Sequence, residues 1–218
     1  MRATSARLTG GDAVADHPHL LHEGPTLLAP SPGRVTRPPR RLREPPRGNS
    51  VPMPDVIRLI LDDHENFRTR FEELFAQRGN TQAANEIWLG LAARLEIHAS
   101  AEEAHFYPAL LQNVEGSEDE TKDAIGDHDE IREGIRRSEA AEVGSDEWWA
   151  GIQDARDAND EHLAEEERDD IPDFLRVASV EFRQELGARY EQYFAEHPGG
   201  RGLSGEDKDP DAYVEANS

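Results

Sequence analysis

The feature that most constrains the fold of this chain is a repeated spacing of histidine and glutamate. Residues 98–108 read HASAEEAHFYP, and residues 162–172 read HLAEEERDDIP. Both segments contain a histidine, three residues, two glutamates, four residues and a proline. The same 64-residue offset relates His64 to His128 and Asp63 to Asp127. Histidine accounts for only 9 of 218 residues, so chance does not explain the match. The sequence therefore predicts two copies of one helical hairpin.

Apolar residues recur at helical spacing from Pro54 onward. This pattern predicts helices over residues 55–77, 82–112, 118–139 and 146–178, with a fifth helix near 180–196. Short connections containing glycine separate the first four helices, which should make consecutive helices antiparallel. Ser117 and Glu120 predict a capping box at the start of the third helix. Ser145 is the predicted N-cap of the fourth.

The predicted fold class is all-α: an up-down-up-down four-helix bundle with an extra C-terminal helix and disordered N- and C-terminal tails. The predicted parts are a Pro/Arg-rich leader at 1–52, the bundle at 53–178, an accessory helix at 179–198 and an acidic tail at 199–218. The leader holds 9 of the 14 prolines, which favours disorder. Its histidines, His17, His19 and His22, are interpreted as incidental, with a metal-binding tail as the alternative. Another alternative is that translation begins at Met53.

The net charge of −22 arises after the leader, which itself holds eight arginines and four acidic residues. A strongly acidic folded part argues against nucleic acid and anionic membranes as partners and should attract cations. The chain has no cysteine, so any metal site must use histidine and carboxylate ligands. No apolar run approaches the roughly 20 residues that a transmembrane helix needs. We therefore expect a cytoplasmic protein.

Helical geometry places the repeated polar residues on common faces. Residues four apart share a helix face, so His98 points with Glu102 and His162 points with Glu166. His64 and His128 lie within the apolar stripes of the first and third helices. A polar group on an apolar stripe costs free energy unless it is paired or binds a metal. Imidazoles and carboxylates suit iron, manganese or zinc, and bundle interiors hold such sites. The candidate metal ligands are His64, His98, Glu102, His128, His162 and Glu166.

Further residues could support such a site. Asp63, Asp127, Glu103 and Glu167 could each hold the second ring nitrogen of a metal-bound imidazole from a neighbouring helix. The alternative is that they form a solvated acidic face. His105 could be an extra ligand, a proton carrier or a boundary histidine. Tyr107 could donate a hydrogen bond, quench an oxidising species or serve as a core aromatic.

The segments DDHENF, HASAEEAHFYP, GDHDEI and HLAEEERDDIP together resemble the hemerythrin-like (HHE cation-binding) family over roughly residues 54–178. The resemblance implies a four-helix bundle with a non-haem di-iron centre and the six ligands given above. Oxygen-carrying hemerythrins have a fifth histidine four residues after the one equivalent to His128, where this chain has Arg132. If both glutamates bridge, with an oxo or hydroxo bridge from solvent, each metal keeps one open position.

Two open positions suit binding of a small molecule across the metal pair. The expected function is therefore that of a di-iron protein acting on small oxygen species or iron, by peroxide disproportionation or ferrous-iron oxidation. The alternative is a non-enzymatic sensor or carrier of oxygen, nitric oxide or iron. The expected cofactor is two iron ions, with manganese or zinc as alternatives, and no catalytic residue is expected beyond the ligands. Small molecules are the expected partners, without nucleic acid or membrane, and a homodimer is left open.

Overall fold

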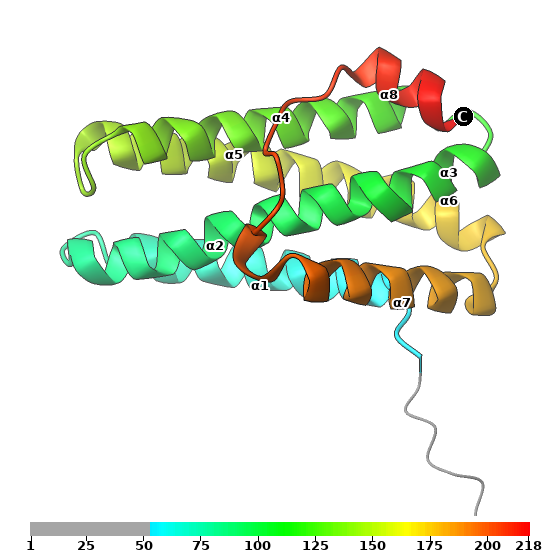
Figure 1. Cartoon of the computed structure of the whole chain (residues 1–218), viewed down its shortest axis with the longest axis horizontal. Coiled ribbons are helices and arrows are strands. Elements are labelled where there is room, and N and C mark those ends of the chain that lie inside the picture. The colour runs from blue at the N-terminus through cyan, green and yellow to red at the C-terminus, as the bar shows by residue number, and fades with distance from the viewer. Residues whose placement is uncertain (1–52) are drawn as a thin grey trace, which may run out of the picture. The chain divides into compact units, whose positions relative to one another are not determined.

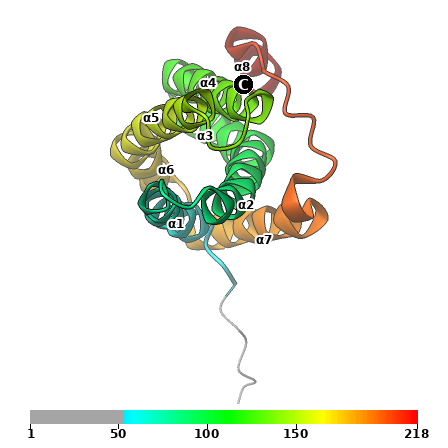
Figure 2. The ribbon, with the colours of Figure 1, turned by 90° about the vertical axis from the view of Figure 1, so that its left-hand side faces the viewer.

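The computed structural model describes residues 53–218, which form an all-α bundle. Four long helices lie side by side around a shared interior, and consecutive helices run antiparallel (Figures 1 and 2). These are α1 (Val56–Ala76), α2 (Thr81–Ala101), α4 (Glu118–Ala140) and α5 (Asp146–Arg168). The shorter helices are α3 (Tyr107–Asn113), α6 (Asp170–Val177), α7 (Val180–Glu196) and α8 (Pro210–Asn217). The predicted helical bundle is confirmed. The predictions for residues 1–52, including their three histidines, lie outside the described residues.

Side-chain capping explains where the last bundle helix, α5, begins, but it does not explain the start of α4. Ser145 adopts an extended backbone, and its side chain accepts a hydrogen bond of 3.1 Å from the backbone N–H of Trp148, as predicted. The predicted capping box at Ser117 was wrong. Ser117 has a ψ of 7°, so its side chain does not cap the first turn of α4. Its hydroxyl instead donates to the carbonyl of Val114 at 3.0 Å.

The predicted helix over residues 82–112 is not regular. Residues 102–106 form a π-helical turn, closed by a hydrogen bond from the N–H of Tyr107 to the carbonyl five residues earlier. Pro108 gives the physical reason, since proline lacks an N–H and its ring clashes with the carbonyl four residues before it. The predicted helix over 146–178 is interrupted at Asp169, three residues before Pro172. Both corrections follow from the repeated proline.

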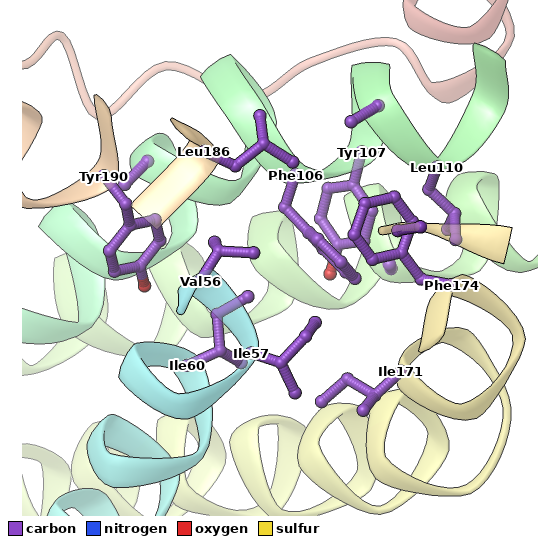
Figure 3. Packing of buried hydrophobic residues seen from close by; sticks show 14 of the residues in the cluster. Val56, Ile57, Ile60, Phe106, Tyr107, Leu110, Ile171, Phe174, Leu186 and Tyr190 are labelled. Carbon is purple, nitrogen blue, oxygen red and sulfur yellow. The ribbon is translucent and has the colours of Figure 1, made fainter. Parts of the chain in front are cut away.

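Two apolar clusters lie on either side of a polar layer in the bundle. Along α1, Ile60 belongs to one cluster and Phe67 to the other, and the fully buried His64 lies between them. Helix α7 packs against α1 and α2 and adds Leu186 and Tyr190 to the first cluster (Figure 3). The predicted accessory helix at 180–196 is thereby confirmed, and the polar layer lies between the two apolar clusters along the bundle.

Helices α4 and α5 approach each other through glycine. A Cβ atom added to Gly134 would lie 2.4 Å from the backbone nitrogen of Ala155, and one added to Gly151 would lie 2.5 Å from that of Ser138. Real Cβ atoms do not approach backbone so closely, so any side chain at these positions must push the helices apart. No spacing pattern in the sequence indicated this contact.

Replacing Gly134 by alanine should therefore destabilise the fold by about 1–3 kcal/mol, the usual cost of overpacking. Gly90→Ala is the matched control, because it lies within α2 with no atom within 4 Å of an added Cβ. That change should stabilise the fold by about 0.5–1 kcal/mol, since alanine favours the helix interior. Equilibrium unfolding in urea measures both. A neutral Gly134→Ala variant would contradict the close approach.

The structure corrects the prediction of a disordered tail at 199–218. Helix α8 lies against α4 (Figure 1). The ammonium group of Lys208 pairs with the carboxylate of Glu103, and the hydroxyl of Tyr213 donates to the backbone carbonyl of Glu103 at 2.6 Å. Glu103 is buried, and a buried carboxylate needs a compensating charge. The segment is therefore held against the bundle next to the π-helical turn.

Within residues 53–218, none of the helices combines the length and the apolar composition that a membrane crossing requires.

Candidate metal centre

All six predicted ligands converge in the middle of the bundle. Each is at most 2% exposed. Helix α1 contributes one histidine, α2 and its π-helical turn contribute a histidine and a glutamate, and α4 and α5 repeat the pattern. In chain order they are His64, His98, Glu102, His128, His162 and Glu166. The common depth follows from the repeat, because equivalent residues of two equivalent hairpins face one interior.

The ligand atoms form two groups that share Glu102. In the first group, one donor atom each of His64, His98 and Glu102 lie within 4.8 Å of one another. In the second group, the same holds for Glu102, His128 and His162. Glu102 Oε1 lies 3.0 Å from His98 Nε2, and Glu102 Oε2 lies 3.4 Å from His128 Nε2. The first group thus takes both imidazoles from the first hairpin, the second group takes both from the second hairpin, and Glu102 belongs to both groups.

Glu166 lies beside the first group. Its Oε2 atom is 3.1 Å from His64 Nε2, and its Oε1 atom accepts a hydrogen bond of 3.2 Å from the hydroxyl of Tyr107. Burial and the negative charge of Glu166 raise the pKa of Tyr107 well above its usual value, so the phenol stays protonated and can donate. Tyr107 is therefore both a core aromatic and a hydrogen-bond donor. A bridging role for Glu166 stays a prediction.

Several buried polar atoms of this layer have no hydrogen-bond partner. They are Nε2 of His64, Nε2 of His98, both carboxylate oxygens of Glu102 and Oε2 of Glu166. An unpaired buried polar atom costs free energy, and a charged one costs more. These atoms are nitrogen and oxygen donors gathered on one interior space, which is the donor set that iron, manganese or zinc accepts. The residues present therefore fit a bound metal pair.

The electrostatics of the layer favour positive charge. Burial lowers the pKa of His98, but Glu102 and Asp63 outweigh it and raise that pKa to about 9. Burial likewise lowers the pKa of His162, yet its contacts with Asp127 and Glu102 raise it to about 10. The carboxylates thus favour the protonated form of these two imidazoles when no metal ion is bound. A divalent cation would supply the same positive charge.

Each imidazole has an acidic partner on a different helix at its outer nitrogen. Glu167 lies 2.9 Å from Nδ1 of His64, and Glu103 lies 2.9 Å from Nδ1 of His128. The other two contacts are His98 Nδ1 to Asp63 Oδ2 at 3.4 Å and His162 Nδ1 to Asp127 Oδ2 at 3.7 Å. Hydrogen bonds across helix boundaries confirm the predicted partners of His64, His98 and His128. The distance between His162 and Asp127 exceeds that of a hydrogen bond. The pairs of the two copies are related by the 64-residue offset. A carboxylate at Nδ1 holds the proton there and turns the Nε2 lone pair inward.

Two arginines, also 64 residues apart, support these acids. Arg68 Nη1 lies 2.9 Å from Glu167 Oε1, and Arg132 Nη2 lies 2.9 Å from Glu103 Oε1. Arg132 is buried and also pairs with Glu96 at 3.0 Å. Arg132 therefore fixes the carboxylate of Glu103 at a position where oxygen-carrying hemerythrins have a histidine ligand. Neither pair was predicted from the sequence, although the 64-residue offset between the two arginines was a signal for them.

Helix α7 breaks the symmetry between the two copies. The hydroxyl of Tyr190 lies 2.8 Å from Nδ1 of His98, and α7 has no counterpart in the repeat, so no sequence signal pointed to this contact. His105 belongs to neither ligand group. Its half-buried ring lies edge-on to Tyr193, with 5.6 Å between ring centroids. This placement agrees with the interpretation of His105 as a boundary histidine.

Removing an outer acid should weaken cation binding at one group. Glu167→Ala leaves Nδ1 of His64 without its carboxylate, and losses of this kind cost about 10- to 100-fold in metal affinity. Glu161→Ala, an exposed change on the same helix, is the matched control and should bind as the unchanged protein does. Competition with a chelator of known affinity measures both. Equal affinity in the two variants would remove Glu167 from the supporting residues.

The fold and the site define a class: a four-helix-bundle cation-binding protein with histidine and glutamate donors in its interior. The family model described as the hemerythrin HHE cation binding domain matches residues 55–174, and the chain belongs to this family. No significant match exists among curated proteins or among solved structures.

Proposed function

We propose that the two donor groups hold two iron ions and that the protein uses them in redox chemistry on small oxygen species or on iron itself. The ligands would be the six buried histidines and glutamates, completed by a bridging oxygen from solvent. The reaction would be disproportionation of peroxide, in which two hydrogen peroxide molecules give dioxygen and two waters, or oxidation of ferrous iron. A pair of iron ions supplies two-electron chemistry for either reaction.

The observation that carries this proposal is the equal supply of imidazoles to the two groups. Each group has two histidines and the shared Glu102. Arg132, which replaces the fifth histidine of oxygen carriers, is turned toward Glu96 and Glu103. Two groups that each have two imidazoles and the shared glutamate favour a substrate held across both cations. A carrier that binds oxygen at one metal would need unequal shells.

The surrounding residues would serve the chemistry in separate ways. The acids at the outer nitrogens keep the imidazoles in one tautomer with Nε2 directed inward. Tyr107 donates its proton to Glu166 in a hydrogen bond and so fixes the orientation of that carboxylate. The two apolar clusters surround the ligands with a low-dielectric environment on both sides along the bundle, which strengthens the electrostatic interactions inside the layer.

The test is to load the full chain with ferrous iron without oxygen, measure bound iron, and then add hydrogen peroxide. Sustained release of dioxygen, at many molecules per chain, would support peroxide disproportionation. Consumption of added ferrous iron with dioxygen would support the oxidation reaction. A reversible change of the optical spectrum without turnover would instead support the alternative, a sensor or carrier. Failure to retain iron would reject the proposal.

A further inference from the structure

A cavity of about 240 Å³ lies between α4 and the α5–α6 segment and reaches two of the predicted ligands, His162 and Glu166. Acidic side chains from both sides line it, among them Glu120, Asp123 and Asp170. Arg168 also lines the cavity, where it pairs with neighbouring acids of its own segment. The cavity therefore joins an acidic surface to the second donor group.

Two buried carboxyl groups in the wall have oxygens without a hydrogen-bond partner. Asp170 is 6% exposed, and its side chain makes no hydrogen bond or ion pair within residues 53–218. Burial and the nearby Glu166 raise the pKa of Asp170 to about 8. Glu166 itself is 1% exposed, and its Oε2 atom has no hydrogen-bond partner. A cation in the cavity would stabilise both groups.

The repeat shows that the fold does not require these acids. The first copy has apolar residues at the positions equivalent to the three wall acids named above: Val56, Leu59 and Phe106. Val56 and Phe106 are fully buried, and Leu59 packs against the same cluster. Figure 3 shows Val56 and Phe106 packed together with Leu186 of α7. In the first copy of the repeat, apolar packing fills this region beside the ligand layer. In the second copy, the equivalent region is an acidic cavity.

We propose that this cavity is a transit site through which hydrated divalent cations reach the buried donor groups, arriving first at His162 and Glu166. The inference rests on the proposed function, since it assumes that the groups hold cations. Six water molecules at about 30 Å³ each occupy roughly 180 Å³, so a hydrated ion fits the cavity. The acids raise the local concentration of cations at its mouth and do not attract neutral peroxide.

The test measures the rate at which Co²⁺ enters the full chain after its metal has been removed with a chelator. The visible absorption of Co²⁺ bound to nitrogen and oxygen ligands reports loading in a stopped-flow instrument. The variant Glu120→Gln, Asp123→Asn, Asp170→Asn removes three carboxyl groups from the wall and leaves the side-chain shapes and the predicted ligands unchanged. The matched control is Glu72→Gln, Glu185→Gln, Glu191→Gln, which removes three exposed charges from α1 and α7.

The cavity variant should load Co²⁺ about tenfold more slowly at low salt, with a weaker salt dependence and an unchanged final absorbance. The control variant should load at nearly the rate of the unchanged protein. Equal loading rates for the cavity variant and the unchanged protein, or equal slowing in both variants, would overturn the transit site alone. Absence of Co²⁺ binding by the unchanged protein would overturn the proposed metal centre and the transit site together.

Discussion

Replacing Glu102 by alanine is expected to reduce the bound metal from two ions per chain to none. Glu102 is the one residue that both donor groups share, with its oxygens 3.0 Å from His98 Nε2 and 3.4 Å from His128 Nε2. Its loss removes an anionic ligand from both positions at once. The remaining imidazoles would then hold each cation without the carboxylate that lies nearest to both. Elemental analysis of desalted protein measures the result.

His98→Ala provides the informative comparison. It removes one imidazole from the first group and leaves Glu102, His128 and His162 in the second, so one ion per chain should remain. Glu130→Ala, an exposed change on α4, should retain both. Circular dichroism establishes that the variants are folded. Two ions bound to the Glu102→Ala variant would show that the shared carboxylate is not a ligand, and the arrangement of the centre would need revision.

Metal binding should also produce a large gain in thermal stability. Several buried donor atoms have no hydrogen-bond partner when no metal is present. A cation that binds only the folded chain therefore shifts the folding equilibrium toward the folded state. At a free metal concentration 1,000 times the dissociation constant, each site contributes about 4 kcal/mol. For a chain of this size that corresponds to roughly 8–16 °C per site in the unfolding midpoint. Thermal unfolding of metal-free and metal-loaded protein measures the shift.

The Glu102→Ala variant is the natural control for this measurement, because it keeps the bundle and should lose the cations. Its midpoint should be nearly independent of added metal. A similar metal-dependent rise in this variant would place the bound ions elsewhere, on the acidic surface of the chain. An unchanged midpoint in the unaltered protein would contradict metal binding at the buried layer.

The bundle and the grouping of its polar residues could be predicted because local rules determine both. Helical periodicity located the long helices, and the 64-residue offset placed equivalent histidines at equivalent depth. The same offset, with the need to satisfy both ring nitrogens, predicted that acids such as Asp63 and Glu167 would contact imidazoles on other helices. Each of these inferences uses only spacing within a helix or identity between the two copies.

Features set by contacts between distant segments could not be predicted in this way. Tyr190 reaches His98 from a helix without a counterpart in the repeat. Lys208 stays ordered because it reaches a buried carboxylate 105 residues earlier. One local signal was overlooked: Asp209 precedes a proline at the start of α8 and accepts from the N–H of Ala212 at 2.8 Å, a common way to begin a helix.

The π-helical turn at residues 102–106 and the interruption at Asp169 have a consequence for changes in chain length. Pro108 follows His98 by ten positions, and Pro172 follows His162 by ten positions. The helix accommodates this spacing by a π-helical turn in the first copy and by a break at Asp169 in the second. Deleting one residue from the regular helix between His98 and the turn would rotate the following segment by about 100° and carry Tyr107 away from Glu166. Single-codon insertions or deletions should therefore be tolerated in the connections near Gly79 and Gly144 and be damaging between either histidine and its proline.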